Sequence, residues 1–568
     1  MSAHAPALSA GRLWAQRTRL AAARVEAWPV PRVLGAFVLV EWLAVLALAL
    51  TVRHSGWLYY QGGDQLWYYT LGWLLGHGQL SQTEVGYGWS VVLAPLSRIA
   101  GPNLVSALPV ILLLNVLVLL PAAMLALYGI AVRIGGRLFG YWTLLVWIAV
   151  PFIGIVYTNA GYHQRYTELT LPQSLGLTAM ADFPSTVACL ATAYFVARVV
   201  FDEHPQLIDA VAGGVAAGAT IAIKPSAALF LVGPALAFAY RRRLVSAAAF
   251  VVGILPALLA LMVWKQRGLG HLPILGAPGG RPLADGAGLA AGAPIAGLDF
   301  GKYFNNLSWQ HFIDELDQLR EHFWSGRLLQ WLVVAGMIGL ARRSRTGLLL
   351  VGGSFAAYIV VKGSYQGAGI EDSSLFRIMM PIFPAFVICL ASLPFLLPHA
   401  PRRLAEWRPT VRPAATRRQW ALVTAAVAVS GVAPLAAFAA ADTNGGLVAA
   451  NIGKTGMPIP ANIDLGLEAT VRRGAVTLRW RGGQPAGGPV FFRIWRAHRD
   501  VFRCTVGSGG KLCNVSLPEV GVARTPEFRD RPAAGRWVYR VAIAANWLND
   551  PAYGDPYLVS RPLVVTVQ

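Results

Sequence analysis

The sequence predicts a polytopic α-helical membrane protein that ends in a small all-β domain. Of its 568 residues, 55% are hydrophobic and 13% are charged, and the mean hydropathy is +0.51. A change of pattern follows near Asn462, where short runs of alternating apolar and polar residues begin. Long apolar runs fit helices that cross a bilayer, and alternation fits strands with one buried face.

Apolar runs divide the first part of the chain into about eleven transmembrane helices. The first run is not followed by a small-residue cleavage site, so we expect it to stay as an anchor. The eighth and ninth runs are short and interrupted by glycine. The expected spans lie near residues 33–53, 105–131, 138–157, 183–201, 207–223, 226–240, 244–264, 328–341, 346–362, 376–398 and 419–441.

Basic residues set the expected orientation, because lysine and arginine are enriched in cytoplasmic loops. The basic segments are Arg12 to Arg32, Arg133 with Arg137, Arg241 to Arg243, Arg342 to Arg345, and Arg402 to Arg418. They fall on one side of the spans, which predicts a bacterial inner membrane protein with a cytoplasmic N-terminus and an extracytoplasmic C-terminus. This distribution explains the net charge of +21, so we do not expect nucleic acid as a partner.

The orientation divides the chain into four parts. Residues 1–32 form a cytoplasmic N-terminus, 33–441 the transmembrane domain, 442–461 a linker, and 462–568 the last domain. Four longer connections lie outside, at residues 54–104, 158–182, 265–327 and 363–375. The first connection, and the stretch from Phe304 to Trp324 in the third, predict helices that lie along the membrane surface.

The last domain is expected to be a β-sandwich, with strands at 476–480, 490–495, 537–543 and 563–567. Its run from Gly535 to Asn546 resembles the late-strand region of fibronectin type III domains. That resemblance implies that Tyr539 is the corner tyrosine and Trp480 the core tryptophan. It implies nothing about catalysis, since this sandwich serves many roles.

Cysteine positions add information on the compartment. Cys504 and Cys513 flank a glycine-rich turn in the polar C-terminal region. This spacing suits a disulfide across a hairpin, which needs an oxidising compartment, and two free thiols are the alternative. Cys189 and Cys389 lie in apolar runs and are expected to be packing residues.

Acidic residues near the outer surface are the catalytic candidates. Asp64 follows the first span within Gly62-Gly63-Asp64-Gln65, at the depth of lipid head groups. Enzymes that use lipid-linked sugars need an acid or a base at that depth, so Asp64 is the leading catalytic candidate. Its alternative role is the N-cap of a helix that starts near Gln65. Glu168 and Asp182 are secondary acid candidates.

Two basic residues are candidates for binding the phosphate of a lipid-linked sugar, the donor in such a reaction. Lys224 lies where two apolar runs meet, before Pro225, and charge at membrane depth usually has a partner. It is either a counter-charge for phosphate or a lysine that extends to the surface at a turn. Arg377 begins the tenth span, where it either binds phosphate or forms a salt bridge with Glu371 or Asp372.

Residues 159–168 concentrate polar and aromatic groups that suit sugar or phosphate, although an ordinary solvated loop is the alternative. Arg165 is a third candidate for the donor phosphate. His163 has no second histidine at metal-ligand spacing, so we expect no metal site on it. The candidates for substrate contact are Gln65, Tyr87, Trp89, Tyr162 and His163.

Five short stretches occur in a fixed order relative to the spans. They are Gly63-Asp64, Tyr87-Gly-Trp89 with Pro95, Ala181-Asp182-Phe-Pro184, Lys224-Pro225, and Arg377 with Pro381 and Pro384. In this order and position they resemble the GT-C glycosyltransferases, integral membrane enzymes that take sugars from polyprenyl-phosphate carriers. That family also carries a periplasmic domain after many spans.

The resemblance implies that the first-loop acid, Asp64, is the general base. It would take a proton from the acceptor hydroxyl while the sugar is displaced with inversion. The family often has two adjacent acids there, whereas Gln65 follows Asp64 in this chain, and whether a divalent metal takes part stays open; no other cofactor is implied. The implied partners are a polyprenyl-phosphate sugar donor, membrane lipid, and a glycan, lipid or protein acceptor of the cell envelope.

The alternative function is a secondary transporter, or a flippase for lipid or polysaccharide. Such proteins often show paired halves around a midplane site, and the span pattern shows no halving. The sequence has no Gly-x-x-x-x-Gly-Lys-Ser/Thr loop, which disfavours ATP-driven transport. A surface-assembly scaffold would leave the eleven spans without a purpose beyond anchoring.

Overall fold

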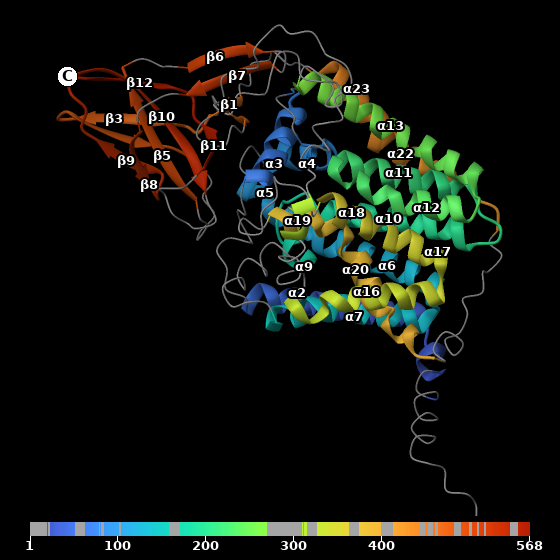
Figure 1. Ribbon diagram of the computed structural model, residues 1–568. Helices are drawn as coiled ribbons and strands as arrows, with labels where there is room; N and C mark the ends of the chain where they lie inside the picture. The colour runs from blue at the N-terminus through green and yellow to red at the C-terminus, as the bar shows by residue number, and fades with distance from the viewer. Residues whose placement is uncertain are drawn as a thin grey trace, which may run out of the picture.

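A bundle of long helices with a β-rich part at one end makes up the computed structural model (Figure 1). In the helical part the structure describes residues 23–51, 63–78, 85–100, 104–157, 171–269, 326–362, 374–398 and 413–441, with a few positions near residue 310. In the C-terminal part it describes residues 449–451, 458–460, 464–481, 490–498, 502–507, 510–515, 519–545 and 555–568.

Each of the eleven expected spans is helical. Seven helical segments in the described part of the chain are long and apolar enough to cross a bilayer, which confirms the predicted fold class. They are α2 (Val30–Thr51), α5, η1 and α6 (Leu104–Leu113, Leu114–Leu119, Leu120–Gly135), α7 (Arg137–Tyr157), α10 (Asp182–Phe201), α13 (Leu244–Leu269), the segment from α19 to η7 (Ser374–Met379, Leu393–Leu396) and the segment from α22 to α23 (Arg417–Val427, Ala433–Ala440).

The remaining four expected spans are shorter helices. They are α11 (Leu207–Ile223), η4 with α12 (Pro225–Leu231, Val232–Tyr240), α16 (Gly326–Arg343), and the segment of α17, η5 and α18 (Arg345–Gly347, Leu348–Gly352, Gly353–Lys362). Between α19 and η7 the chain continues through η6 (Met380–Ile382) and α20 (Phe383–Ala391), and η8 (Ala428–Val432) joins α22 to α23. Three of these segments, η1, η5 and η8, are π-helical.

The ends of α12 and α17 lie away from the β-rich part (Figure 1), and arginines lie at these ends, since Arg241 follows α12 and Arg345 begins α17. There they tie helix ends together through backbone carbonyls. Arg343 Nε donates to Ile134 O at 3.1 Å, and Arg241 Nε donates to Val200 O at 2.9 Å. These contacts bring the basic segment Arg342 to Arg345 beside that of Arg133 and Arg137, and Arg241 to the end of α10.

The opposite end of the bundle is built from short helices. They are α3 (Gly63–Gly76), α4 (Gly88–Ala100), α9 (Pro172–Leu175) and α19. Helices α3 and α4 pack closely, and their aromatic side chains Tyr69 and Trp89 are buried. The first outer connection therefore contains helices, as expected. Of the expected helix from Phe304 to Trp324, most positions lie outside the described residues.

The C-terminal part contains two sheets arranged as a sandwich. One has the order β3-β4-β9 (Glu468–Arg472, Ala475–Arg479, Glu527–Asp530). The other has the order β11-β10-β5-β8, with β12 also paired to β10 (Asp555–Val559, Gly535–Ala545, Val490–Ala497, Glu519–Ala523, Leu563–Val567). The four expected strands correspond to β4, β5, β10 and β12. Strand β12 alternates buried with more exposed residues, whereas β5 and β10 are largely buried on both faces.

Two residues singled out by the fibronectin resemblance lie in this core. Trp480 is buried and packs edge-on to Phe492, with ring centroids 5.1 Å apart. Tyr539 donates its hydroxyl to Asp530 Oδ2 at 2.7 Å, and burial raises the pKa of this hydroxyl, so it remains a donor. The fibronectin type III resemblance itself stays a prediction.

A third sheet differs from the expected layout. It has the order β2-β1-β7-β6, with β1 (Ala449–Asn451) and β2 (Pro458–Pro460) inside the interval expected to be a linker. Strand β1 pairs in parallel with β7 (Gly510–Val515), which forms a hairpin with β6 (Phe502–Gly507). Residues 449–451 and 458–460 therefore belong to the β-rich part, and three-residue strands beside proline and glycine carry too little alternation to predict.

The register of β6 and β7 places Cys504 directly opposite Cys513. Opposite residues in an antiparallel pair have Cα atoms at a separation that a disulfide can bridge. The bond itself is not among the described contacts, and it stays a prediction.

We expect a Cys504–Cys513 disulfide in protein purified from membranes. Under denaturing conditions, a thiol reagent should label two of the four cysteines before reduction and all of them afterwards. Cys189 and Cys389, which are free, serve as internal controls for complete labelling. Labelling of all four cysteines without a reductant would contradict the bond.

Candidate active site

Three charged residues from separate segments of the chain meet at the end of the bundle that carries α3 and α4. Lys224 Nζ donates to Asp182 Oδ1 in a short ion pair, and Arg377 Nη2 lies 3.7 Å from Asp182 Oδ2. Lys224 Nζ also donates to Arg377 O at 3.3 Å. We call Asp182, Lys224 and Arg377 the ion cluster.

The ion cluster is largely removed from solvent, since the side chains of Asp182, Lys224 and Arg377 are 3%, 16% and 19% exposed. Charges interact more strongly in such surroundings than in water. Two cations face one carboxylate, so these three residues together carry one excess positive charge. The arrangement can therefore accept an anionic group.

Local sequence explains how each member is presented. Asp182 lies in the first turn of α10, where a negative charge is favoured by the helix dipole. Lys224 has an extended backbone (φ −140°, ψ 96°) between α11 and η4, because Pro225 cannot continue α11. Arg377 lies in the last turn of α19. Each charge thus stands at or near a helix end at one level of the bundle.

The segment that leads to Asp182 is fixed by three buried polar side chains. Gln65 Oε1 accepts from Ala179 N at 3.0 Å, and Trp89 Nε1 donates to Ala179 O at 2.8 Å. Asn115, in π-helical η1, donates from Nδ2 to Thr178 O at 3.0 Å. Both polar groups of the Ala179 peptide backbone are therefore bound by side chains of the first outer connection.

The segment that leads to Lys224 is fixed from the same connection. Tyr68 donates its hydroxyl to Ile223 O at 3.3 Å. A Cβ at Gly88 would lie 2.8 Å from Ile223 N, so glycine is needed for this close approach. Tyr87 donates to Ser430 O at 2.5 Å, and burial raises the pKa of its hydroxyl. The loop at Tyr87 is thereby held between α11 and η8.

These contacts give three predicted substrate-binding residues a different observed role. Gln65, Tyr87 and Trp89 are 0%, 1% and 2% exposed, and their side chains bind the backbone. They position the segments that carry Asp182 and Lys224. Direct contact of these residues with a substrate stays a prediction.

The other candidates are placed only in part. Asp64 is the second residue of α3, next to Gln65, and its side chain lies outside what the structure describes. Tyr162, His163, Arg165 and Glu168 lie outside the described residues. Arg377, for which we expected either phosphate or a salt bridge with Glu371 or Asp372, lies beside Asp182, and Glu371 and Asp372 lie outside the described residues. Lys224 does not extend to the surface, because Asp182 holds its ammonium group.

Sequence reasoning missed a buried acid within the first span. Glu41 Oε1 accepts from Trp147 Nε1 at 3.0 Å and from Gln173 Nε2 at 2.9 Å, and its side chain is fully buried. Gln173 lies in α9, within the connection expected to be outside. That connection is therefore buried in the bundle from residue 171 onward. The sequence signal for this buried acid was its position as a lone acid in an apolar run, where a carboxylate usually has a partner.

Among the described residues, no group of three or more histidine, cysteine, aspartate and glutamate side chains could hold a metal ion.

Comparison with known proteins gives distant structural likenesses. No family model and no curated protein matches the chain. ArnT from Cupriavidus metallidurans bound to undecaprenyl phosphate is 16% identical over 70% of this chain and 62% of its own, with a TM-score of 0.39. The second likeness is to the archaeal oligosaccharyltransferase AglB from Archaeoglobus fulgidus, in complex with an inhibitory peptide and a dolichol-phosphate. AglB is 12% identical over 72% of this chain and 55% of its own, with a TM-score of 0.38. The chain spans less than two thirds of either protein, and these likenesses assign it no activity.

We expect Glu41→Leu to destabilise the protein by about 2–5 kcal/mol, because two buried donors would lose their acceptor. Glu41→Gln should cost less, since its side-chain oxygen can still accept from both donors. Thermal unfolding in one detergent would measure both, with Leu43→Ala, at an exposed position of α2, as the control. Equal stability of Glu41→Leu and the wild type would show that Glu41 does not hold α9.

Proposed function

We propose that the chain is an integral membrane glycosyltransferase of the GT-C type. It transfers a sugar from a polyprenyl-phosphate donor to an acceptor of the cell envelope, with inversion. The observation that carries this proposal is the ion cluster: three positions singled out separately in the sequence meet at one end of the bundle, and two of them are cations.

The distribution of basic residues supports a reaction outside the cytoplasm. Arginines concentrate at one end of the bundle. Because basic residues are enriched in cytoplasmic loops, we take this end to be the cytoplasmic one. The ion cluster and the β-rich part then lie on the extracytoplasmic side of a bacterial inner membrane. A lipid-linked donor can reach the cluster there from the bilayer, so no soluble nucleotide-binding domain is needed.

The ion cluster supports binding of the donor phosphate. Arginine offers paired N–H donors to phosphate oxygens, and lysine offers a compact charge. Asp182 holds both cations at the helix ends before a donor arrives, so little rearrangement is required. In this mechanism Lys224 and Arg377 bind the carrier phosphate, and Asp182 is a positioning residue for both.

Asp64 is proposed as the general base. It precedes Gln65, whose side chain accepts a hydrogen bond from Ala179, three residues before Asp182. The backbone of Asp64 thus lies beside the segment that carries the ion cluster. An acceptor hydroxyl is a weak nucleophile and needs a base, whereas the leaving lipid phosphate is already anionic and needs no acid.

One observation favours the alternative, a transporter or flippase. Glu41 is a buried acid near the middle of the first span, and such residues often mark proton or substrate pathways. Its hydrogen bonds to Trp147 and Gln173 also fit a structural role. ArnT and AglB, with undecaprenyl phosphate and dolichol-phosphate in their structures, agree with the proposed donor class but are too distant to support it by themselves.

Removing Lys224 together with its partner separates phosphate binding from folding. Lys224→Gln alone leaves a buried carboxylate short of a counter-charge, which is costly. The double variant Asp182→Asn/Lys224→Gln removes both charges and should keep the fold. We expect its KM for the lipid-linked donor to rise about tenfold to a hundredfold, the loss typical of a hydrogen bond to a charged group.

A second ion pair supplies the matched control. Arg198 Nη2 lies 3.0 Å from Asp209 Oδ1, near the arginine end of the bundle, with side chains 22% and 4% exposed. The double variant Arg198→Gln/Asp209→Asn should leave the donor KM unchanged. A wild-type donor KM in Asp182→Asn/Lys224→Gln would show that Lys224 serves only as a counter-ion.

Asp64→Asn tests the proposed base. The amide keeps the size of the side chain and can still cap a helix, so stability should fall little. It cannot take a proton, and loss of a general base typically slows turnover by about 100-fold to 10,000-fold. Sugar transfer by protein in nanodiscs measures this, and near-normal turnover would remove Asp64 from catalysis. No transfer by the wild type from any lipid-linked sugar, with substrate flux in vesicles, would favour the transporter.

A further inference from the structure

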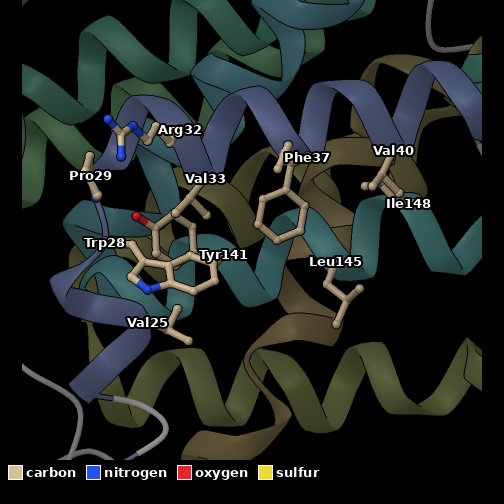
Figure 2. Close-up of a pocket in the computed structure, with 11 residues that line it drawn as sticks. Val25, Trp28, Pro29, Arg32, Val33, Phe37, Val40, Tyr141, Leu145 and Ile148 are labelled. Carbon is tan, nitrogen blue, oxygen red and sulfur yellow. The ribbon is translucent and has the colours of Figure 1, made fainter.

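An apolar groove opens between α2 and α7 near the arginine end of the bundle (Figure 2). Its volume is about 650 Å³, within the range of ligand sites in proteins. Side chains of both helices line it, among them Trp28, Val33, Phe37, Tyr141, Leu145 and Ile148. The groove lies at the other end of the bundle from the ion cluster.

The surface around the groove faces lipid. Leu39 and Leu43 of α2, and Trp142 and Leu145 of α7, are between 43% and 56% exposed. Large apolar side chains that are exposed on membrane-spanning helices contact hydrocarbon. The molecules that reach the groove are therefore bilayer lipids.

One end of the groove is polar. Figure 2 shows Arg32 at this end beside Pro29, with the hydroxyl of Tyr141 on the same side, while Leu145, Val40 and Ile148 lie at the other end. Tyr141 is 5% exposed, and its ring stacks on that of Tyr128 with centroids 5.3 Å apart. No acidic side chain in the described ranges forms an ion pair with Arg32. The polar end thus offers a cation next to an apolar channel.

We propose that this groove binds an anionic glycerophospholipid of the leaflet at the arginine end. Its phosphate lies at Arg32, and an acyl chain lies along Val33, Phe37 and Ile148. The charges are complementary, because basic pockets between transmembrane helices bind anionic head groups. A polyprenyl-phosphate donor at the ion cluster has its head group at the other end, so it is not the occupant.

The bound lipid would stabilise a helix that packs sparsely on the protein. In the apolar stretch of α2, 17% of the residues are buried, against 83% in the stretch that begins at Arg377. Helix α2 carries Glu41 and leads toward α3. A lipid that fills the groove adds contacts between α2 and α7, so it should raise the unfolding temperature of the whole chain.

Lipid selectivity tests the proposal. Delipidated full-length protein is titrated with phosphatidylglycerol or phosphatidylcholine of the same acyl chains, and thermal unfolding and native mass spectrometry are recorded. We expect phosphatidylglycerol to bind about fivefold more tightly, the effect of one basic residue at a membrane surface. Arg32→Gln should abolish this preference. Arg24→Gln, at an exposed position outside the groove, should keep it.

A second variant tests the apolar part of the groove. Ala36 lines the groove, so Ala36→Trp should fill it and weaken the binding of both lipids. Leu39→Trp, on the lipid-facing surface of the same helix, is the size-matched control and should bind as the wild type does. Equal binding of both lipids by the wild type, or an unchanged preference in Arg32→Gln, would overturn the proposal. Displacement of phosphatidylglycerol from this groove by a polyprenyl phosphate would overturn the assigned occupant.

Discussion

The ion pair between Asp182 and Lys224 is the constraint on which the outer end of the bundle depends. A buried carboxylate without a counter-charge is costly, and removal of one partner from a buried pair typically costs about 3–5 kcal/mol. Asp182 begins α10, and Lys224 follows α11. Their pairing, with Arg377 of α19 beside them, requires three helix ends to meet at one level.

Side chains of the first connection, residues 54–104, hold those helix ends in place. Gln65 and Trp89 satisfy the backbone of Ala179, and Tyr68 binds the carbonyl of Ile223. Two π-helical segments take part, since η1 carries Asn115 and η8 presents the Ser430 carbonyl to Tyr87. A π-helical turn changes the local backbone pairing, which makes such groups available, and π-helical turns often occur at functional sites.

Apolar runs predicted the helices, because burial in a bilayer requires continuous hydrophobic sequence, and alternation predicted the main strands. Asp182, Lys224 and Arg377 were each singled out, but not their mutual contact. Helix packing decides that contact, and no local pattern encodes it. For the same reason Asp182 was not among the partners expected for Arg377, which were Glu371 and Asp372. The role of Glu41 could not be predicted either, since its hydrogen-bond partners Trp147 and Gln173 are remote in sequence.

A carboxylate between two cations has a consequence for a phosphate-binding site. Asp182 keeps Lys224 and Arg377 in place without a ligand, so the positive charge is preorganised where a phosphate would arrive. The same carboxylate reduces the net charge of the cluster to one, which weakens the attraction for any phosphate. Under the proposed function, in which the carrier phosphate is released after transfer, this compromise is useful because binding donor and product too tightly would slow turnover. Asp182 thereby both orders the two cations and limits their affinity.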